Sequence, residues 1–152
     1  MSNLQIGDKA PNFNLPTDSN SSIKLDSIKD KKKIIYFYPK DDTPGCTVEA
    51  QDFSNLNSEF AAKNTIIIGI SKDSPKSHDK FKEKYNLTFT LASDEDIEIC
   101  KLYGSWVEKS MYGRKYMGID RSSFLIDENN NIIKIWRKVK VKNHAKEVLD
   151  SI

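Results

Sequence analysis

Two short, continuous runs of apolar residues constrain the fold of this chain more than any other feature. Residues 34–38 read Ile-Ile-Tyr-Phe-Tyr and residues 66–70 read Ile-Ile-Ile-Gly-Ile, without the polar alternation of a strand that faces water on one side. Such runs are typical of strands that are covered on both faces. A segment with helical features follows each run, so the pattern predicts parallel strands joined by helices.

Cap and turn residues place the other expected elements. Extended segments at 12–15 and 23–25 predict an N-terminal hairpin. A further strand is expected at 87–92, and helices are expected at 44–63, 75–85, 94–103 and 143–152. The run Asp-Glu-Asn-Asn-Asn between Ser122–Ile126 and Ile132–Trp136 is typical of a hairpin turn. Residues 104–121 show no clear periodicity, so they form either a functional loop or an element that the pattern hides. We expect a single α/β domain over residues 1–152, with a mixed central sheet flanked by helices.

The composition argues against several classes of protein. A formal net charge of +2 is too balanced to indicate a nucleic-acid or membrane-surface partner. The first residues contain no apolar segment of the kind found in a secretory signal, and the longest apolar runs are far shorter than the roughly 18–20 residues of a membrane helix. We therefore expect a soluble, cytoplasmic protein.

The chain has two cysteines, Cys46 and Cys100, which are too few for a disulfide framework and do not form a CxxC pair. His78 and His144 lie far apart in the sequence without metal-ligand spacing, and their polar neighbours predict that both are surface residues. We expect neither a metal nor another cofactor.

Cys46 stands out because it falls in the first turn of a predicted helix that follows a buried strand. Thr43 and Pro44 are typical of a helix start, as N-cap and first helical residue. The partial positive charge of a helix N-terminus favours the thiolate, and cysteines placed there have pKa values lowered from ~8.5 to ~3.5–7.5. Gly45 allows a substrate to approach the backbone closely. This pattern predicts a nucleophilic thiol.

A structural interpretation of the same cysteine stays open at this point. Cys46, Ala50 and Phe53 share one helix face, and unpaired cysteines are among the most frequently buried residues. By itself, this spacing favours a small hydrophobic residue in the core.

A family resemblance favours the nucleophile. The spacing of Pro39, Thr43 and Cys46 resembles the active-site signature of peroxiredoxins, which are thiol-dependent peroxidases with a thioredoxin-like fold. Residues 36–50 look like the Q-type subfamily, the bacterioferritin comigratory proteins, and segments at 7–15 and 103–127 resemble further landmarks of that family. The resemblance extends over nearly the whole chain.

The resemblance implies a role for each of four side chains. Cys46 would be the peroxidatic thiolate, Pro39 would shield it from water, and Thr43 and Arg121 would hydrogen-bond the peroxide oxygens. The backbone N–H groups of Gly45 and Cys46 would also bind the substrate, since donors are needed where negative charge develops on oxygen. Arg121 reaches this site only if Ser122–Ile126 runs antiparallel to the parallel strands, a choice that the sequence leaves open.

Another charged neighbour is Glu49, which lies one helical turn beyond Cys46. It is either a partner of Arg121 or another cation, or a solvated charge on the helix surface.

The chain departs from the family pattern at the resolving cysteine. Many Q-type members carry it five positions after the peroxidatic residue, where this chain has Gln51. Either an external thiol, such as thioredoxin, glutathione or another small thiol, resolves the sulfenic acid, or Cys100 does so after local unfolding. Base rates for buried cysteine favour a packing role for Cys100.

The resulting expectation is a monomeric or weakly dimeric peroxidase that reduces hydrogen peroxide and organic hydroperoxides. Two other functions stay open from the sequence. One is thiol–disulfide exchange, which the absence of CxxC disfavours, and the other is a redox-sensing or holdase-type binding protein.

Overall fold

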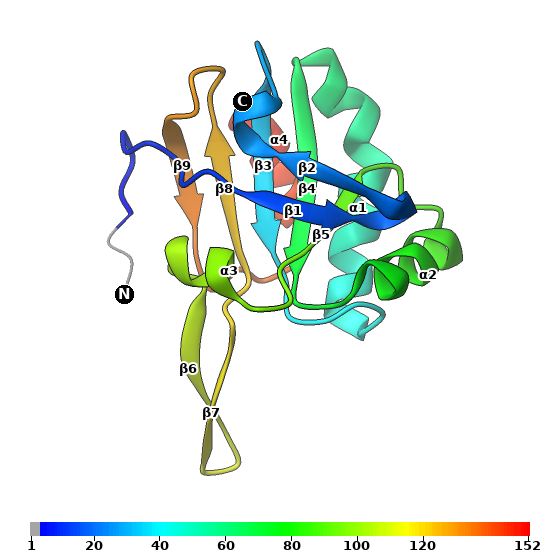
Figure 1. The fold of residues 1–152 in the computed structure, drawn as a ribbon, viewed down its shortest axis with the longest axis vertical. Coiled ribbons are helices and arrows are strands. Elements are labelled where there is room, and N and C mark those ends of the chain that lie inside the picture. Colours follow the sequence, from blue (N-terminus) through cyan, green and yellow to red (C-terminus); the bar gives the residue numbers. More distant parts are fainter. Residues whose placement is uncertain (1–3) are drawn as a thin grey trace.

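A seven-stranded mixed sheet forms the centre of the computed structural model, which describes residues 4–152 (Figure 1). Its strands lie in the order β2-β1-β5-β4-β3-β8-β9. Their bounds are β1 Asn14–Thr17, β2 Ser21–Lys24, β3 Lys32–Phe37, β4 Thr65–Ser71, β5 Thr90–Ser93, β8 Ser122–Ile126 and β9 Ile132–Trp136. Strands β3, β4 and β5 are parallel, whereas β8 is antiparallel to β3 and to β9, and β1 is antiparallel to β2 and β5. The expected mixed sheet and N-terminal hairpin are confirmed.

The four α-helices are α1 Pro44–Ala62, α2 Pro75–Tyr85, α3 Glu98–Leu102 and α4 His144–Asp150. Proline occupies the first position of α1 and of α2, where its missing N–H costs no hydrogen bond. At the start of α2, the Ser74 hydroxyl accepts a hydrogen bond from the N–H of Ser77, as an N-cap should. Two short 3-10 turns, Asp18–Asn20 and Leu25–Ser27, follow β1 and β2.

The two faces of the sheet bury separate hydrophobic clusters because successive side chains of a strand point to opposite sides. Ile34 and Tyr36 of β3 face the cluster that is covered by α1, α2 and α4. Ile35 and Phe37 face the other cluster, which the N-terminal segment and α3 cover. The buried run in β3 is thus explained by burial on both faces, as the sequence predicted.

The segment without clear periodicity is a second hairpin, made of β6 Trp106–Met111 and β7 Arg114–Ile119. It projects from the body of the molecule as an arm (Figure 1). Tyr112 and Gly113 at its tip both have positive φ angles, which the tight two-residue hairpin turn requires. Because the arm is largely exposed on both faces, it lacks the alternation that normally reveals a strand.

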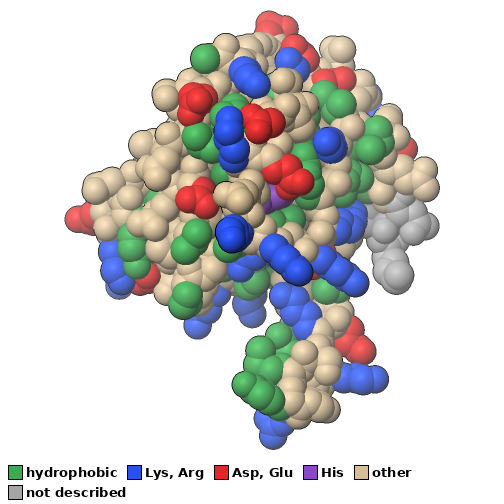
Figure 2. Space-filling view, turned by 180° about the vertical axis from the view of Figure 1, so that it is seen from behind, with side chains coloured by type: hydrophobic (Ala, Val, Ile, Leu, Met, Phe, Trp, Pro, Cys, Tyr) green, Lys and Arg blue, Asp and Glu red, His purple; other side chains and the backbone are tan. Residues whose placement is uncertain are grey.

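The arm also carries exposed hydrophobic side chains next to Lys and Arg (Figure 2). They are Met111, Tyr112, Tyr116 and Met117.

Other boundaries differ from the expectation by a few residues. Helix α3 begins at Glu98 instead of residue 94, because the Asp94 carboxylate accepts hydrogen bonds from the N–H groups of Ile99 and Cys100 and Ile97 adopts a left-handed conformation. Strand β5 begins at Thr90 instead of residue 87. In residues 4–152 no helix is long and apolar enough to cross a membrane.

The prediction that both histidines lie on the surface is wrong. His78 is fully buried and His144 is 3% exposed. Each ring has polar partners that make burial tolerable: His78 contacts Asp41 and the Ala92 carbonyl, and Nε2 of His144 lies 2.8 Å from the Ser123 hydroxyl. In residues 4–152 no group of three or more His, Cys, Asp or Glu side chains has the arrangement of a metal site.

Candidate active site

The carboxyl end of β3 and the start of β8 lie side by side because the two strands are antiparallel. Phe37 is paired with Ser122 in this register, so the residue before β8, Arg121, lies next to the loop that leads from β3 into α1. Ser122–Ile126 is therefore antiparallel to the parallel strand β3, as the implied role of Arg121 requires. Both segments are at the end of the sheet from which the arm projects (Figure 1).

Cys46 lies in the first turn of α1. The N–H of Thr47 donates to the Thr43 carbonyl at 2.8 Å, which is the first hydrogen bond of the helix. The amides of Gly45 and Cys46 precede that bond and are therefore free of the helical ladder at its positive end. The Cys46 side chain is only 2% exposed, so only a small reactant reaches the sulfur without movement of the helix start.

Arg121 contacts the sulfur directly. Its Nη2 donates to Sγ of Cys46 at 3.4 Å, and its Nη1 donates to Oε1 of Glu49 at 2.7 Å. Burial alone would lower the pKa of Arg121, but the negative charges of Glu49 and Cys46 outweigh this effect. The pKa is therefore raised overall, and the guanidinium stays charged. The two ends of the guanidinium thus hold two side chains of α1 and place a positive charge next to the sulfur of Cys46.

The sequence left the role of Glu49 open, and the structure pairs it with Arg121. Its carboxylate is 1% exposed, and burial raises its pKa to about 7 even though the adjacent Arg121 lowers it. Oε2 has no hydrogen-bond partner among the described residues. The charge next to Arg121 therefore changes near neutral pH.

Thr43 occupies the N-cap position of α1, but its side chain does not cap the helix. Its hydroxyl donates instead to the Lys40 carbonyl at 2.8 Å, within the same loop. This hydroxyl hydrogen is therefore already engaged, and only the lone pairs of the oxygen remain free to accept a hydrogen bond. Pro39 is partly buried at the start of this loop, and its shielding role stays a prediction.

Gly45 leaves space that the guanidinium occupies. A Cβ atom at this position would lie 3.2 Å from Nη2 of Arg121, closer than an unstrained contact. Any other residue here would therefore force the guanidinium of Arg121 to move by a few tenths of an ångström.

Cys100 is far from this constellation in the fold. It is a buried free thiol on α3, in the hydrophobic cluster on the face of the sheet opposite to the cluster that contains Cys46. Burial, followed by the nearby Asp94, raises the pKa of the Cys100 thiol well above its usual value. Both features describe a packing residue and a poor nucleophile.

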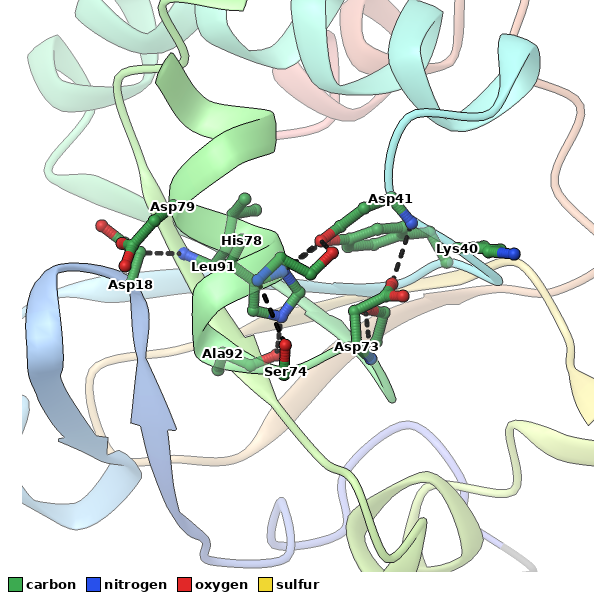
Figure 3. A network of polar contacts seen from close by, with 12 residues as sticks. Asp18, Lys40, Asp41, Asp73, Ser74, His78, Asp79, Leu91 and Ala92 are labelled. Atoms are coloured by element: carbon green, nitrogen blue, oxygen red, sulfur yellow. Dashed lines mark hydrogen bonds and ion pairs between the residues drawn. The ribbon is translucent and has the colours of Figure 1, made fainter. Parts of the chain in front are cut away.

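A buried polar network beside the loop was missed by the sequence reasoning (Figure 3). Asp41 of the loop contacts His78 of α2 at 2.7 Å, and the Asp41 N–H donates to the Asp73 carboxylate at 2.8 Å. No periodicity or motif connects these residues in the sequence, because a hydrogen bond between a loop and a distant helix leaves no regular spacing.

Comparison with known proteins agrees with this geometry. Residues 6–135 match the model of the AhpC/TSA family. The chain belongs to this family. Its relatives include a Coxiella burnetii protein named as a putative peroxiredoxin bcp, which is 52% identical over 96% of this chain and 97% of its own length. Peroxiredoxins are thiol-dependent peroxidases, and this chain is an enzyme of that class.

Solved structures of peroxiredoxins share the fold. A cysteine-to-serine variant of Xylella fastidiosa PrxQ superposes with a TM-score of 0.94 at 39% identity, covering 99% of this chain and 96% of that one. The Xanthomonas campestris bacterioferritin comigratory protein, studied for its alkyl peroxide reduction activity, superposes with a TM-score of 0.90 at 38% identity, with the same coverage. The resemblance to Q-type peroxiredoxins and the thioredoxin-like fold are confirmed.

Proposed function

We propose that Cys46 is the peroxidatic residue of this peroxiredoxin. The observation that carries the proposal is the contact of 3.4 Å between Nη2 of Arg121 and the sulfur of Cys46, at the positive end of α1. A guanidinium and a helix N-terminus both stabilise a thiolate, which is the nucleophilic form of cysteine.

The chemical step is an in-line displacement on a hydroperoxide. The Cys46 thiolate attacks the terminal oxygen, a sulfur–oxygen bond forms and the oxygen–oxygen bond breaks. The sulfur is oxidised to sulfenic acid, and the leaving alkoxide or hydroxide takes a proton from water. Negative charge grows on the leaving oxygen, where Arg121 and the amides of Gly45 and Cys46 supply donors. The Thr43 oxygen accepts the peroxide O–H and orients the substrate, and Pro39 limits the access of water.

An external thiol completes the cycle in this proposal. A first thiol attacks the sulfenic acid, giving a mixed disulfide with Cys46 and one water, and a second thiol releases Cys46 and leaves as a disulfide. The location of Cys46 and Cys100 in separate hydrophobic clusters supports an external reductant over resolution by Cys100. Thioredoxin, which carries both thiols in one protein, and glutathione both fit this scheme.

The substrates in this proposal are hydrogen peroxide and small organic hydroperoxides. The small exposed fraction of Cys46 supports compact substrates, and the alkyl peroxide reduction studied in the Xanthomonas campestris relative supports organic ones.

The test is peroxide consumption by Cys46→Ser in the presence of thioredoxin and thioredoxin reductase. We expect no turnover from this variant and an unchanged circular dichroism spectrum. Mass spectrometry of the wild-type protein after one equivalent of peroxide should place a single trapped sulfenic acid on Cys46. Turnover by the variant would overturn the proposal.

A further inference from the structure

The buried His78 ring connects two parts of the fold that meet beside the peroxide site. It lies on α2 with a side chain that is fully buried. Its Nδ1 is 2.7 Å from Oδ2 of Asp41, in the loop between β3 and α1, and its Nε2 is 3.1 Å from the Ala92 carbonyl on β5 (Figure 3). The mechanism above does not use this ring.

Two hydroxyl groups also contact the Asp41 side chain. The Tyr38 hydroxyl donates to Oδ1 at 2.6 Å and the Ser77 hydroxyl donates to Oδ2 at 2.8 Å. Burial, and then the adjacent Asp41, raise the pKa of Tyr38, so this hydroxyl keeps its hydrogen and remains a donor. Together with the His78 ring, these two donors hold the Asp41 side chain in place.

Both ring nitrogens of His78 have polar partners. A carbonyl oxygen only accepts, so Nε2 of His78 donates to Ala92. Nδ1 lies within hydrogen-bond distance of the Asp41 carboxyl group. The ring is therefore held between the loop and β5 by a hydrogen bond at each nitrogen.

The backbone of the loop is held from the same side. The Asp41 N–H donates at 2.8 Å to the Asp73 carboxylate, which also accepts from the Ser71 hydroxyl at 2.7 Å. The next residue, Asp42, has a left-handed φ of 57°, a conformation that residues other than glycine rarely adopt. Asp41 thus anchors a loop whose strained conformation needs support from its surroundings.

We infer that His78 is a positioning residue for the peroxidase: through Asp41 it holds the loop of residues 39–43 and keeps Cys46 in the first turn of α1, against Arg121. This inference rests on the proposed function of Cys46. The loop ends in Thr43, whose carbonyl accepts the first hydrogen bond of α1, so a shift of Asp41 displaces the donors around the sulfur. Displacing reacting groups by about 1 Å costs up to about 100-fold in rate.

The chain offers a matched control for this idea. His144 is also buried and hydrogen-bonded through its ring, but its partners are Ser123 and Glu147, outside the loop. His78→Gln and His144→Gln therefore remove a buried imidazole from the same protein, and only the first releases Asp41.

The experiment measures two rate constants for Cys46 by mass spectrometry. The first is oxidation by hydrogen peroxide, which needs the donors in place. The second is alkylation by iodoacetamide, measured at a pH where its rate no longer rises, so that it reports access to the thiolate and not the thiolate fraction. For His78→Gln we expect oxidation to fall by about 10- to 100-fold, with alkylation unchanged or faster. For His144→Gln we expect both rates to stay within about threefold of the wild type, since it leaves the loop intact.

Equal loss of oxidation in both histidine variants, or no loss in His78→Gln, overturns the inference. Failure of the wild-type protein to form sulfenic acid on Cys46 instead overturns the proposed function. If His78→Gln does not fold, Tyr38→Phe decides, because it removes one donor to Asp41 and keeps the packed ring. Its oxidation rate should fall without a fall in alkylation, and unchanged oxidation in Tyr38→Phe would overturn the inference.

Discussion

The guanidinium of Arg121 donates to the sulfur of Cys46 although the two residues are 75 positions apart in the chain. The antiparallel pairing of β8 with β3 produces this contact. It places the start of β8 beside the carboxyl end of β3, which leads into α1. Cys46 and Arg121 therefore come from different halves of the chain, and their alignment depends on the register of two central strands.

Arg121→Lys tests whether geometry matters beyond charge. Lysine keeps the positive charge, but a single ammonium does not reproduce the two-ended contact with Glu49 and Cys46. We expect the second-order rate constant for oxidation of Cys46 by hydrogen peroxide to fall by about 100-fold. Arg137→Lys is the control, because Arg137 donates only to backbone carbonyls near α3 among the contacts described. An equal effect of both substitutions would contradict a specific role for Arg121.

Glu49→Gln tests how the buried Glu49 carboxylate makes the stability of the protein depend on pH. Its pKa is raised to about 7 in the folded protein, above the ordinary value of 4.5, so the folded state binds the proton more tightly than the unfolded state. The wild type should therefore lose stability relative to Glu49→Gln as the pH rises from about 4.5 to above 7. The integrated difference is about 3 kcal/mol.

Urea unfolding of both proteins across this pH range measures that difference. A constant difference in the free energy of unfolding would show that the pKa of Glu49 is not raised in the folded protein relative to the unfolded chain.

Gly45→Ala separates helix stability from site geometry. Alanine favours the helix over glycine by up to about 1 kcal/mol, so thermal stability should be retained. The added Cβ would lie 3.2 Å from Nη2 of Arg121 and push the guanidinium away from Cys46. We expect oxidation by hydrogen peroxide to slow by about tenfold, measured beside Gly118→Ala, a glycine on the arm. Unchanged kinetics would mean that Arg121 yields without consequence for the reaction.

Cys100→Ser tests how the oxidised enzyme is resolved. The first oxidation and thioredoxin-dependent turnover should both stay near wild-type rates, because Cys100 packs on the opposite face of the sheet. Replacing a buried thiol by a hydroxyl should lower stability by about 1–3 kcal/mol if the hydroxyl finds no partner. Loss of thioredoxin-dependent turnover with an intact first oxidation would instead assign the resolving role to Cys100.

Sequence reasoning located the parts of the fold that follow local rules. Buried runs predicted β3 and β4, the Ser74 and Pro75 start predicted α2, and the polar turn after β8 predicted the last hairpin. The arm was missed because two exposed faces leave no alternation. The start of α3 was misplaced because the Asp94 side chain forms a turn where a helix was expected.

The candidate site was predictable to the extent that its residues lie close together in the chain. Thr43, Gly45 and Cys46 were found from the helix start, and Arg121 was added only through the family resemblance. The contact between Asp41 and His78 was not found, since burial of a histidine depends on partners from distant strands and loops.

The separation of the two thiols by the central sheet has a consequence for the proposed cycle. In that cycle no internal disulfide protects the sulfenic acid on Cys46, so it would persist until a reductant molecule arrives. During that interval a second peroxide competes to form the sulfinic acid, which most thiols do not reduce. The balance between reductant supply and oxidant load therefore determines how many cycles each molecule completes before it is inactivated.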